Sequence, residues 1–193
     1  MRLVLPYAVW MVLMMALPAT AWAYAVRTAA AAVALGWTLW GFRDRLTLRW
    51  RDLWWGFGAG LLVLALWVLP EELAWYRQWC IFGDQSADVT RSAYDPAVNG
   101  WTLTAVHLFG SAVVIAIAEE LFFRRWLVRF AGFWWMVALF ALEHDRFVAG
   151  AVCGVVYGLI ALRVSLKSAI VAHVTTNFLL GVYVLQSGAW RFW

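Results

Sequence analysis

Residues 101–121, WTLTAVHLFGSAVVIAIAEEL, form an apolar run that ends in two acids. No aspartate, glutamate, lysine or arginine interrupts the run before Glu119. About 20 apolar residues are enough for a helix to cross the ~30 Å hydrocarbon core of a bilayer, so the run predicts a membrane-spanning helix. Glu119 and Glu120 then lie in or near hydrocarbon, where an ionised carboxylate costs several kcal/mol. A functional role is the default explanation for acids in such a place.

The composition of the whole chain agrees with a membrane location. Of its 193 residues, 65% are hydrophobic and 13% are charged, and the mean hydropathy is +0.76. Soluble domains are about half apolar and about a quarter charged. The apolar runs are continuous and do not alternate with polar residues, which favours helices over the strands of a barrel. The predicted fold class is therefore all-α: a polytopic membrane helix bundle of about seven transmembrane or partly re-entrant helices.

Arginine clusters account for the net charge of +4. They lie between apolar runs, where basic residues set membrane topology, so they do not indicate a nucleic-acid partner. The sequence predicts one integral membrane domain over residues 1–193, with amino-terminal helices and an outer loop in 1–100 and the polar motifs in 101–187. The predicted apolar segments are 3–23, 26–42, 53–69, 101–121, 131–143, 147–162 and 168–187.

The basic stretches predict how the segments cross the membrane. Loops 43–52, 124–129 and 163–167 hold most of the basic residues between segments, and the positive-inside rule places them in the cytoplasm. The more acidic stretch 70–100 is then outside. For residues 1–23 a cleaved signal peptide is the alternative, since a short basic start precedes an apolar body and an A-W-A ending.

Spacing gives the two acids at the end of the fourth segment different neighbours. On an α-helix, Glu120 and Arg124 are four residues apart and share a face, which predicts an ion pair. Glu119 is turned roughly 100° away and is free to face the interior of the bundle. A second pair, Glu71 and Glu72, follows a proline and opens a polar stretch. That pair predicts an ordinary loop.

Two further polar sites interrupt the apolar segments of the second half. In FALEH, Phe140 and His144 are four residues apart, and in HVTTN the same spacing separates His173 from Asn177. Residues at this spacing lie on one helical face. A histidine and an asparagine one turn apart in an apolar helix must both find polar partners.

His107 and Cys153 also lie in apolar segments, and their neighbours in the sequence indicate that they pack against other side chains. His107 precedes Glu119 by twelve residues, which is roughly 18 Å along a helix. We predict that it is a packing or outer-interface residue. Cys153 lies inside an apolar segment, and no second cysteine lies at the spacing of a metal-binding or disulfide motif. We therefore predict neither a disulfide nor a metal site at Cys153.

Depth in the membrane brings the polar sites together. Glu119 precedes Arg124 by five residues and His173 follows Lys167 by six, so both acid and imidazole lie about 7–9 Å inside the same membrane face. The segment 131–143 has too few apolar residues for a complete span. We therefore predict a partial or re-entrant helix that delivers His144 to mid-depth.

These residue types can hydrolyse an amide without a covalent intermediate. A carboxylate and a neutral histidine can hold and deprotonate a water, the role open to Glu119 and His144. A second histidine and an asparagine can donate hydrogen bonds to a developing oxyanion, the role open to His173 and Asn177. An alternative uses Glu119, His144 and His173 as zinc ligands, although the HExxH helix of a zinc protease is missing.

The three sites, in this order, resemble the motifs of the CAAX-protease and bacteriocin-processing (Abi) family of intramembrane endopeptidases. EELFFR fits EExxxR, FALEH fits FxxxH and HVTTN fits HxxxN. The resemblance covers residues 116–180, about a third of the chain. The carboxy-terminal sequence HVTTNFLLGVYVLQSGAWRFW further resembles the CAAX-protease-related proteins found with bacterial exosortase and PEP-CTERM systems. The first hundred residues resemble the family only in being hydrophobic.

The family is understood as glutamate-dependent proteases, so the resemblance implies roles for single residues. Glu119 and His144 would activate the water, while His173 and Asn177 would stabilise the oxyanion. No cofactor is predicted, and a metal remains open. The expected partners are a membrane-associated peptide or protein substrate and the lipid bilayer of a bacterial inner membrane, which the chain crosses several times. The supporting motif residues are Glu120 and Arg124.

Two rival functions use the same side chains. The chain could be a non-catalytic immunity or assembly factor that keeps the polar pocket for binding. It could also be an electron-transfer protein with His144 and His173 as haem ligands, but Glu119 and Asn177 would then lack a role.

Overall fold

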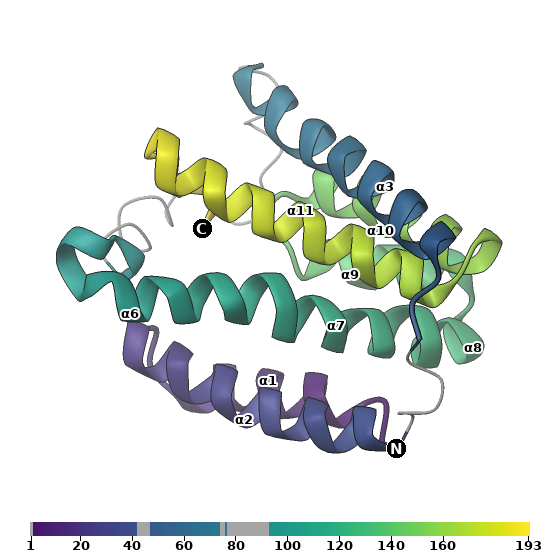
Figure 1. The fold of residues 1–193 in the computed structure, drawn as a ribbon, viewed down its shortest axis with the longest axis horizontal. Coiled ribbons are helices and arrows are strands. Elements are labelled where there is room, and N and C mark those ends of the chain that lie inside the picture. The colour runs from purple at the N-terminus through teal and green to yellow at the C-terminus, as the bar shows by residue number, and fades with distance from the viewer. Residues whose placement is uncertain (1, 42–46, 74–75, 77–92) are drawn as a thin grey trace.

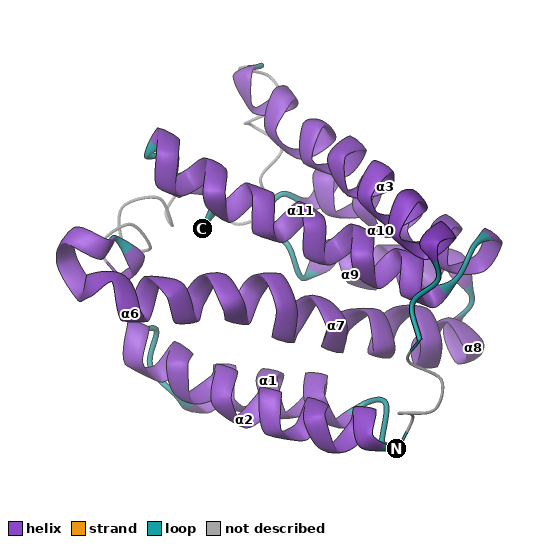
Figure 2. Ribbon diagram, in the orientation of Figure 1, coloured by secondary structure: helices purple, strands orange, loops and turns teal. Residues whose placement is uncertain are grey.

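The computed structural model describes residues 2–41, 47–73, 76 and 93–193, and every regular element in these ranges is helical (Figures 1 and 2). The all-α prediction is therefore confirmed. Two π-helical stretches, η3 (Gly110–Ile115) and η4 (Glu120–Leu127), and two 3-10 helices, η2 (Leu69–Glu72) and η5 (Trp190–Phe192), complete the described elements. The α-helices are α1 (Leu5–Ala16), α2 (Ala21–Trp40), α3 (Trp50–Val68), α6 (Pro96–Phe109), α7 (Ala116–Glu119), α8 (Val128–Ala131), α9 (Phe133–Leu142), α10 (Phe147–Arg163) and α11 (Leu166–Ser187).

Three described stretches are long and apolar enough to cross a membrane: Trp50–Glu71, Pro96–Ala131 and Leu166–Ser187. The helices α1, α9 and α10 are apolar but shorter. With 10 residues, α9 is about 15 Å long, roughly half of the hydrocarbon thickness. The prediction that segment 131–143 holds only a partial helix is confirmed.

A helical rod from Pro96 to Ala131, with a kink at Gly100 where φ is 78°, runs through the centre of the bundle (Figure 1). It contains α6, η3, α7, η4 and α8 in succession. Its two π-helical stretches make wider turns of the kind that often occur at functional sites. Because the rod continues through residues 124–129, the prediction of a loop there is wrong. The rod ends at Gly132, whose φ of 80° is readily adopted by glycine.

The first helix is shorter than predicted. α1 ends at Ala16, whereas the sequence interpretation extended it to residue 23. Pro18 lacks a backbone N–H and disfavours a helical residue before it. Thr20 then caps α2, because its Oγ1 accepts a hydrogen bond from the backbone N–H of Ala23 at 3.2 Å. The two helices form a hairpin beside the central rod (Figure 1).

The described parts of the three basic stretches lie at one end of the bundle, as the topology prediction requires (Figure 1). The Lys167 ammonium donates to the carbonyl of Thr47 at 2.5 Å, and Ser165 donates to the carboxylate of Asp52 at 2.6 Å. These contacts join the amino-terminal ends of α3 and α11. Residues 43–46 and most of the predicted outer loop lie outside the described residues.

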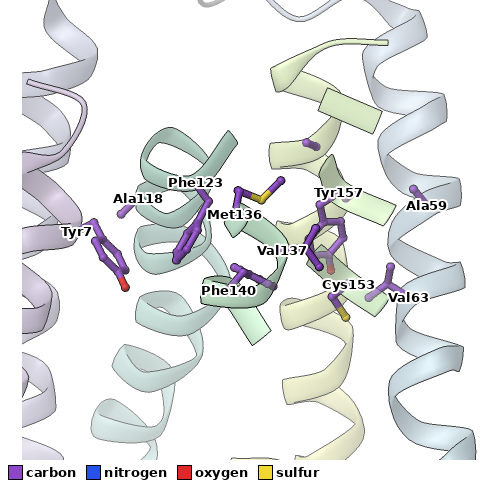
Figure 3. Close-up of a cluster of buried hydrophobic side chains, with 12 residues drawn as sticks. Tyr7, Ala59, Val63, Ala118, Phe123, Met136, Val137, Phe140, Cys153 and Tyr157 are labelled. Atoms are coloured by element: carbon purple, nitrogen blue, oxygen red, sulfur yellow. The ribbon is translucent and has the colours of Figure 1, made fainter. Parts of the chain in front are cut away.

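An apolar core forms where the central rod meets α1, α9, α10, α3 and α11 (Figure 3). The Tyr7 ring stacks on Phe122 with centroids 4.3 Å apart, and Phe123 meets Phe140 edge-on at 5.2 Å. Cys153 is buried in the same cluster, as its predicted packing role requires. The cluster anchors the helices on both sides of the polar residues described below.

Two glycines let α3 and α11 approach closely. A Cβ added to Gly56 would lie 2.5 Å from Val171, and one added to Gly60 would lie 2.7 Å from the carbonyl oxygen of Ala172. Small residues four apart allow this kind of backbone contact between membrane helices. Gly58 lies between them in sequence, and a Cβ there would meet no heavy atom within 4 Å.

Glycines on one face of α10 do the same for α9. Gly150, Gly154 and Gly158 follow one another at four-residue intervals. A Cβ on Gly158 would lie 2.7 Å from the Phe133 ring, and one on Gly150 would lie 3.2 Å from the Cβ of His144. The glycine face therefore holds the short α9 and the turn after it, which carries His144, against α10.

We expect Gly60→Ala to lower the free energy of unfolding by about 1–3 kcal/mol, because the new methyl group meets the backbone of α11. The measurement is reversible unfolding of the purified protein in detergent. Gly58→Ala is the matched control, since it adds the same methyl group to the same helix in open space. It should be neutral or stabilise by up to about 1 kcal/mol. Equal effects of the two substitutions would contradict the proposed packing.

Candidate active site

A cavity of about 300 Å³ lies between the central rod, α11 and the turn after α9. All four residues predicted to be catalytic line it: Glu119 from α7, His144 from the turn, and His173 and Asn177 from α11. The structure therefore brings together side chains from three separate parts of the sequence. Its remaining walls are mostly aromatic and aliphatic, and include Trp10, Tyr24, Trp67, Ile115, Phe140, Tyr157, Leu180, Phe192 and Trp193.

His173 lies between two carboxylates. Its Nδ1 is 2.9 Å from Oε1 of Glu120, and its Nε2 is 3.7 Å from Oε2 of Glu119. A carboxylate can only accept, so Nδ1–H donates to Glu120. The longer contact exceeds hydrogen-bond distance. The hydrogen bond to Glu120 thus orients the imidazole ring so that its Nε2 faces the carboxylate of Glu119.

Glu120 also forms the ion pair that its spacing predicts. Its Oε1 is 3.2 Å from a terminal nitrogen of Arg124, and the Glu120 side chain has 0% exposure. The guanidinium of Arg124 lies 3.9 Å from the centroid of the Phe140 ring, close enough for a cation–π interaction. The pair therefore lies in the apolar core, shielded from solvent, and it holds the carboxylate that orients His173.

The sequence did not reveal the contact between Glu120 and His173. On an ideal α-helix, only Glu119 of the two acids was expected to face the site. In the structure Glu120 opens the π-helical stretch η4, and a wider turn separates successive side chains by less than the α-helical angle. Both carboxylates therefore reach His173. Neither residue spacing nor hydropathy distinguishes a π-helical turn from an α-helical one.

The tautomer of His144 follows from its contact with the backbone. Nδ1 lies 2.8 Å from the carbonyl oxygen of Phe140, one turn earlier. A carbonyl only accepts, so Nδ1 carries the proton and Nε2 is the acceptor in the neutral ring. The ring also packs edge-on against Trp67 at 5.5 Å. His144 thus presents a fixed acceptor nitrogen in a site that it shares with Glu119.

The turn that carries His144 is anchored to the end of α3. The Nε of Arg146 is 3.0 Å from Oε1 of Glu71, which has 1% exposure. The sequence interpretation treated Glu71 as part of an ordinary polar loop, and that prediction is wrong. The buried position of Glu71 depends on where Arg146 lies in the folded chain, which sequence spacing does not give. The side chain of Glu72 lies outside the described residues.

The ring of Tyr157 packs on a face of the His173 imidazole, and hydrogen bonds between hydroxyl groups hold it there. Tyr157 stacks on the imidazole with centroids 4.8 Å apart, and its hydroxyl donates to Thr176 at 2.8 Å. The Thr176 hydroxyl lies 2.9 Å from the carbonyl oxygen of Gly60. The close contact of α3 and α11 therefore supports the position of His173 through Tyr157.

Asn177 is fixed by the central rod. Its Nδ2 donates to the carbonyl oxygen of Ser111 at 3.0 Å. A side-chain amide has two N–H donors, so this bond occupies one and leaves the second. Ser111 lies in η3, the first π-helical stretch, and it also lines the cavity. Neither the contact with Ser111 nor its place in the cavity was predicted.

His107 is buried, as its predicted packing role requires, but it also lines the cavity. The sequence interpretation placed it away from the other polar residues because it is twelve residues from Glu119. The cavity extends along the rod far enough to include both. Among the described residues, no group of three or more His, Cys, Asp or Glu side chains is arranged to hold a metal ion.

Comparison with known proteins finds a family model that matches part of the second half of the chain. Residues 101–179 match the family described as type II CAAX prenyl endopeptidase Rce1-like. The resemblance drawn from the three motifs is thereby confirmed, whereas the exosortase-associated subgroup is not. The matched range contains every residue predicted to be catalytic or supporting. No curated protein and no solved structure matches the chain.

We expect Glu120→Gln and Arg124→Met each to lower the free energy of unfolding by about 3–5 kcal/mol, because either change leaves the other group as an unpaired buried charge. The double variant should lose less than the sum of the two single losses by about 1 kcal/mol or more. Reversible unfolding in detergent measures this double-mutant cycle. Arg125→Met, at an exposed neighbouring position, should stay within about 0.5 kcal/mol. Additive losses would contradict a coupled pair.

Proposed function

We propose that this chain, whose residues 101–179 match the type II CAAX prenyl endopeptidase Rce1-like family, hydrolyses a peptide bond of a membrane-associated peptide or protein. The observation that carries the proposal is the meeting of Glu119, His144, His173 and Asn177 at one cavity. Each of these side chains is an acid–base group or a hydrogen-bond donor. Their mutual placement suits a water-activated attack on a carbonyl.

Glu119 and His144 are proposed to activate the water. A water in the cavity can donate one hydrogen to the Glu119 carboxylate and the other to Nε2 of His144, whose Nδ1–H is engaged by Phe140. Glu119 then takes a proton as the water oxygen attacks the carbonyl carbon of the substrate. Holding the water between two acceptors directs an oxygen lone pair toward the substrate.

His173 and Asn177 are proposed to stabilise the oxyanion that the attack creates. Asn177 can donate the amide hydrogen that Ser111 does not accept. His173 can donate from Nε2 when both of its ring nitrogens carry protons, with Nδ1–H held by Glu120. Donors preorganised in a water-poor site stabilise developing charge more than donors in bulk water do.

The same residues can complete the reaction. When the tetrahedral intermediate collapses, the carbon–nitrogen bond breaks and the departing nitrogen needs a proton. Glu119 can return the proton that it took from the water, so the base of the first step is the acid of the second. The products are then one new carboxyl terminus and one new amino terminus. No covalent bond to the protein forms.

The surroundings of the cavity favour an apolar, membrane-associated substrate. The matched helices include two of the stretches long enough to span a bilayer. The aromatic walls Trp10, Trp67 and Phe192 can bury an apolar side chain beside the site. Together with the basic end of the bundle, these features support a multi-pass membrane protein with the site nearer its cytoplasmic face. Its location in a bacterial inner membrane is part of the proposal.

We expect Glu119→Gln to reduce hydrolysis by at least about 100-fold, because the amide retains the shape of the side chain but cannot accept the proton. Comparative proteomics of membrane-peptide termini, in cells with the native protein and with the variant, identifies the substrate and measures the loss. Glu143→Gln is the matched control, since this acid is exposed beside His144. It should keep the termini that the native protein produces.

The same variants separate an enzyme from a non-catalytic membrane factor. If Glu119→Gln folds, inserts and leaves every peptide terminus unchanged, the hydrolytic function is wrong. Retained biological activity in that variant would then favour an immunity or assembly factor that uses the pocket for binding.

Once a substrate is identified, we expect Asn177→Ala to lower kcat by about 100- to 1000-fold, because the oxyanion loses one donor. KM should change by only a few-fold, since this donor acts mainly in the transition state. Steady-state kinetics in proteoliposomes measures both constants. A large rise in KM with unchanged kcat would instead assign Asn177 to substrate binding.

A further inference from the structure

The turn between α9 and α10 carries His144, and contacts within this helical hairpin fix part of its position. The Nδ1–H of His144 donates to the carbonyl of Phe140 at 2.8 Å, and its backbone N–H donates to the carbonyl of Ala141 at 3.1 Å. A Cβ added to Gly150 would lie 3.2 Å from the Cβ of His144. These partners orient the imidazole on the turn. They belong to α9 and α10, so they do not place the turn relative to the central rod, which carries Glu119.

Two contacts reach the turn from the end of α3. The ring of Trp67 packs edge-on against the His144 imidazole with centroids 5.5 Å apart. Four residues later in the chain, Oε1 of Glu71 lies 3.0 Å from Nε of Arg146. Residues four apart share a helical face, and α3 and η2 follow one another without a break. One face of this helical stretch therefore contacts the turn at two points, at His144 and two residues after it.

The ion pair between Glu71 and Arg146 is buried, so its presence needs an explanation. The Glu71 side chain has 1% exposure and the Arg146 side chain has 10%. Burying two charges costs several kcal/mol per ion, and an apolar pair of similar volume is often as stable. Stability alone therefore does not account for the pair. Its distinctive property is geometric, because a displacement of the turn would separate the charges and leave each of them buried and unpaired.

We propose that Glu71 is a positioning residue that acts through Arg146 and fixes the turn so that Nε2 of His144 faces the water beside Glu119. The proposal rests on the proposed function, in which His144 and Glu119 hold that water. Catalytic groups must lie within about 0.5 Å of their productive geometry, and a misplacement of about 1 Å can cost about 100-fold in rate. Glu71 lies outside residues 101–179, so this support is a feature of the chain beyond the matched range.

Nuclear magnetic resonance of the imidazoles tests the placement of His144 without a substrate. The chain has three histidines, so isotope labelling of histidine in the full chain, purified in detergent, gives three imidazole signals, and the signal that is lost in His144→Gln is assigned to His144. Its chemical shift depends on where the ring lies against Trp67, because an aromatic ring shifts the resonances of nearby nuclei. We expect Glu71→Gln to shift or broaden the His144 signals. Those of His107 and His173 should stay, since other contacts hold these rings.

Steady-state kinetics separate positioning from stability. With an identified substrate, Glu71→Gln and Arg146→Met should each lower kcat by about 10- to 100-fold while KM changes by only a few-fold. The double variant should be about as slow as the slower single variant, because both changes break the same pair. Rates in proteoliposomes are compared at equal amounts of folded protein. Asp145→Asn is the matched control, since it removes an exposed carboxylate from the same turn. It should leave kcat and the His144 signals unchanged.

The outcomes distinguish this proposal from the proposed function. Native kcat and native His144 signals in Glu71→Gln would overturn the positioning role, even if the variant is less stable. Losses that multiply in the double variant would also overturn it, because the two residues would then act separately. If Glu71→Gln does not fold, Glu71→Asp decides, since it keeps the charge but shortens the side chain; unchanged His144 signals would then overturn the proposal. Shifted His144 signals in a chain that produces no new peptide termini would support the positioning role and remove the hydrolytic function.

Discussion

The carboxylate of Glu120 is the constraint on which the rest of the site depends. It pairs with Arg124 on the same rod and accepts a hydrogen bond from His173 on α11. Desolvating two charges costs several kcal/mol per ion, and only good geometry compensates for it. Phe140 from α9 covers the guanidinium. Few arrangements of these three helices would keep both charges of the pair and the His173 imidazole in contact, so we infer that the cluster selects the helix packing and fixes the position of His173 at the same time.

Glycine contacts supply the close approach that this cluster needs. The contact of Gly60 with α11 lets Thr176 reach a backbone carbonyl of α3, and Tyr157 then packs on His173. On the other side, the glycine face of α10 seats the turn that carries His144. Membrane helices gain little from hydrophobic association with one another. Close backbone packing and satisfied polar groups must therefore supply most of the specificity.

The sequence predicted the features that depend on composition and chain order. Apolar runs predicted the helices, and basic stretches predicted which ends of the helices share one side of the bundle. Expected depth in the membrane predicted that Glu119 lies near His173.

The amino-acid sequence did not predict features that depend on local helix geometry or on partners distant in the chain. Glu120 was assigned only to Arg124 because an α-helical turn was assumed, and Glu71 was assigned to a loop because Arg146 is 75 residues away. Pro18 and Thr20 did carry the signal for the end of α1, and the interpretation missed it.

The two π-helical stretches set the rotational phase of the central rod. A π-helical turn contains one residue more than the repeating hydrogen-bond pattern of an α-helix requires. If the same residues of η3 were α-helical, each step would turn slightly further, and everything before η3 would be rotated by roughly 100° relative to Glu119. Ser111 and His107 would then leave the cavity wall while every membrane-spanning length stayed nearly the same. Which residues line the cavity therefore depends on the rotation of one part of the rod relative to another, and a hydropathy profile does not contain that rotation.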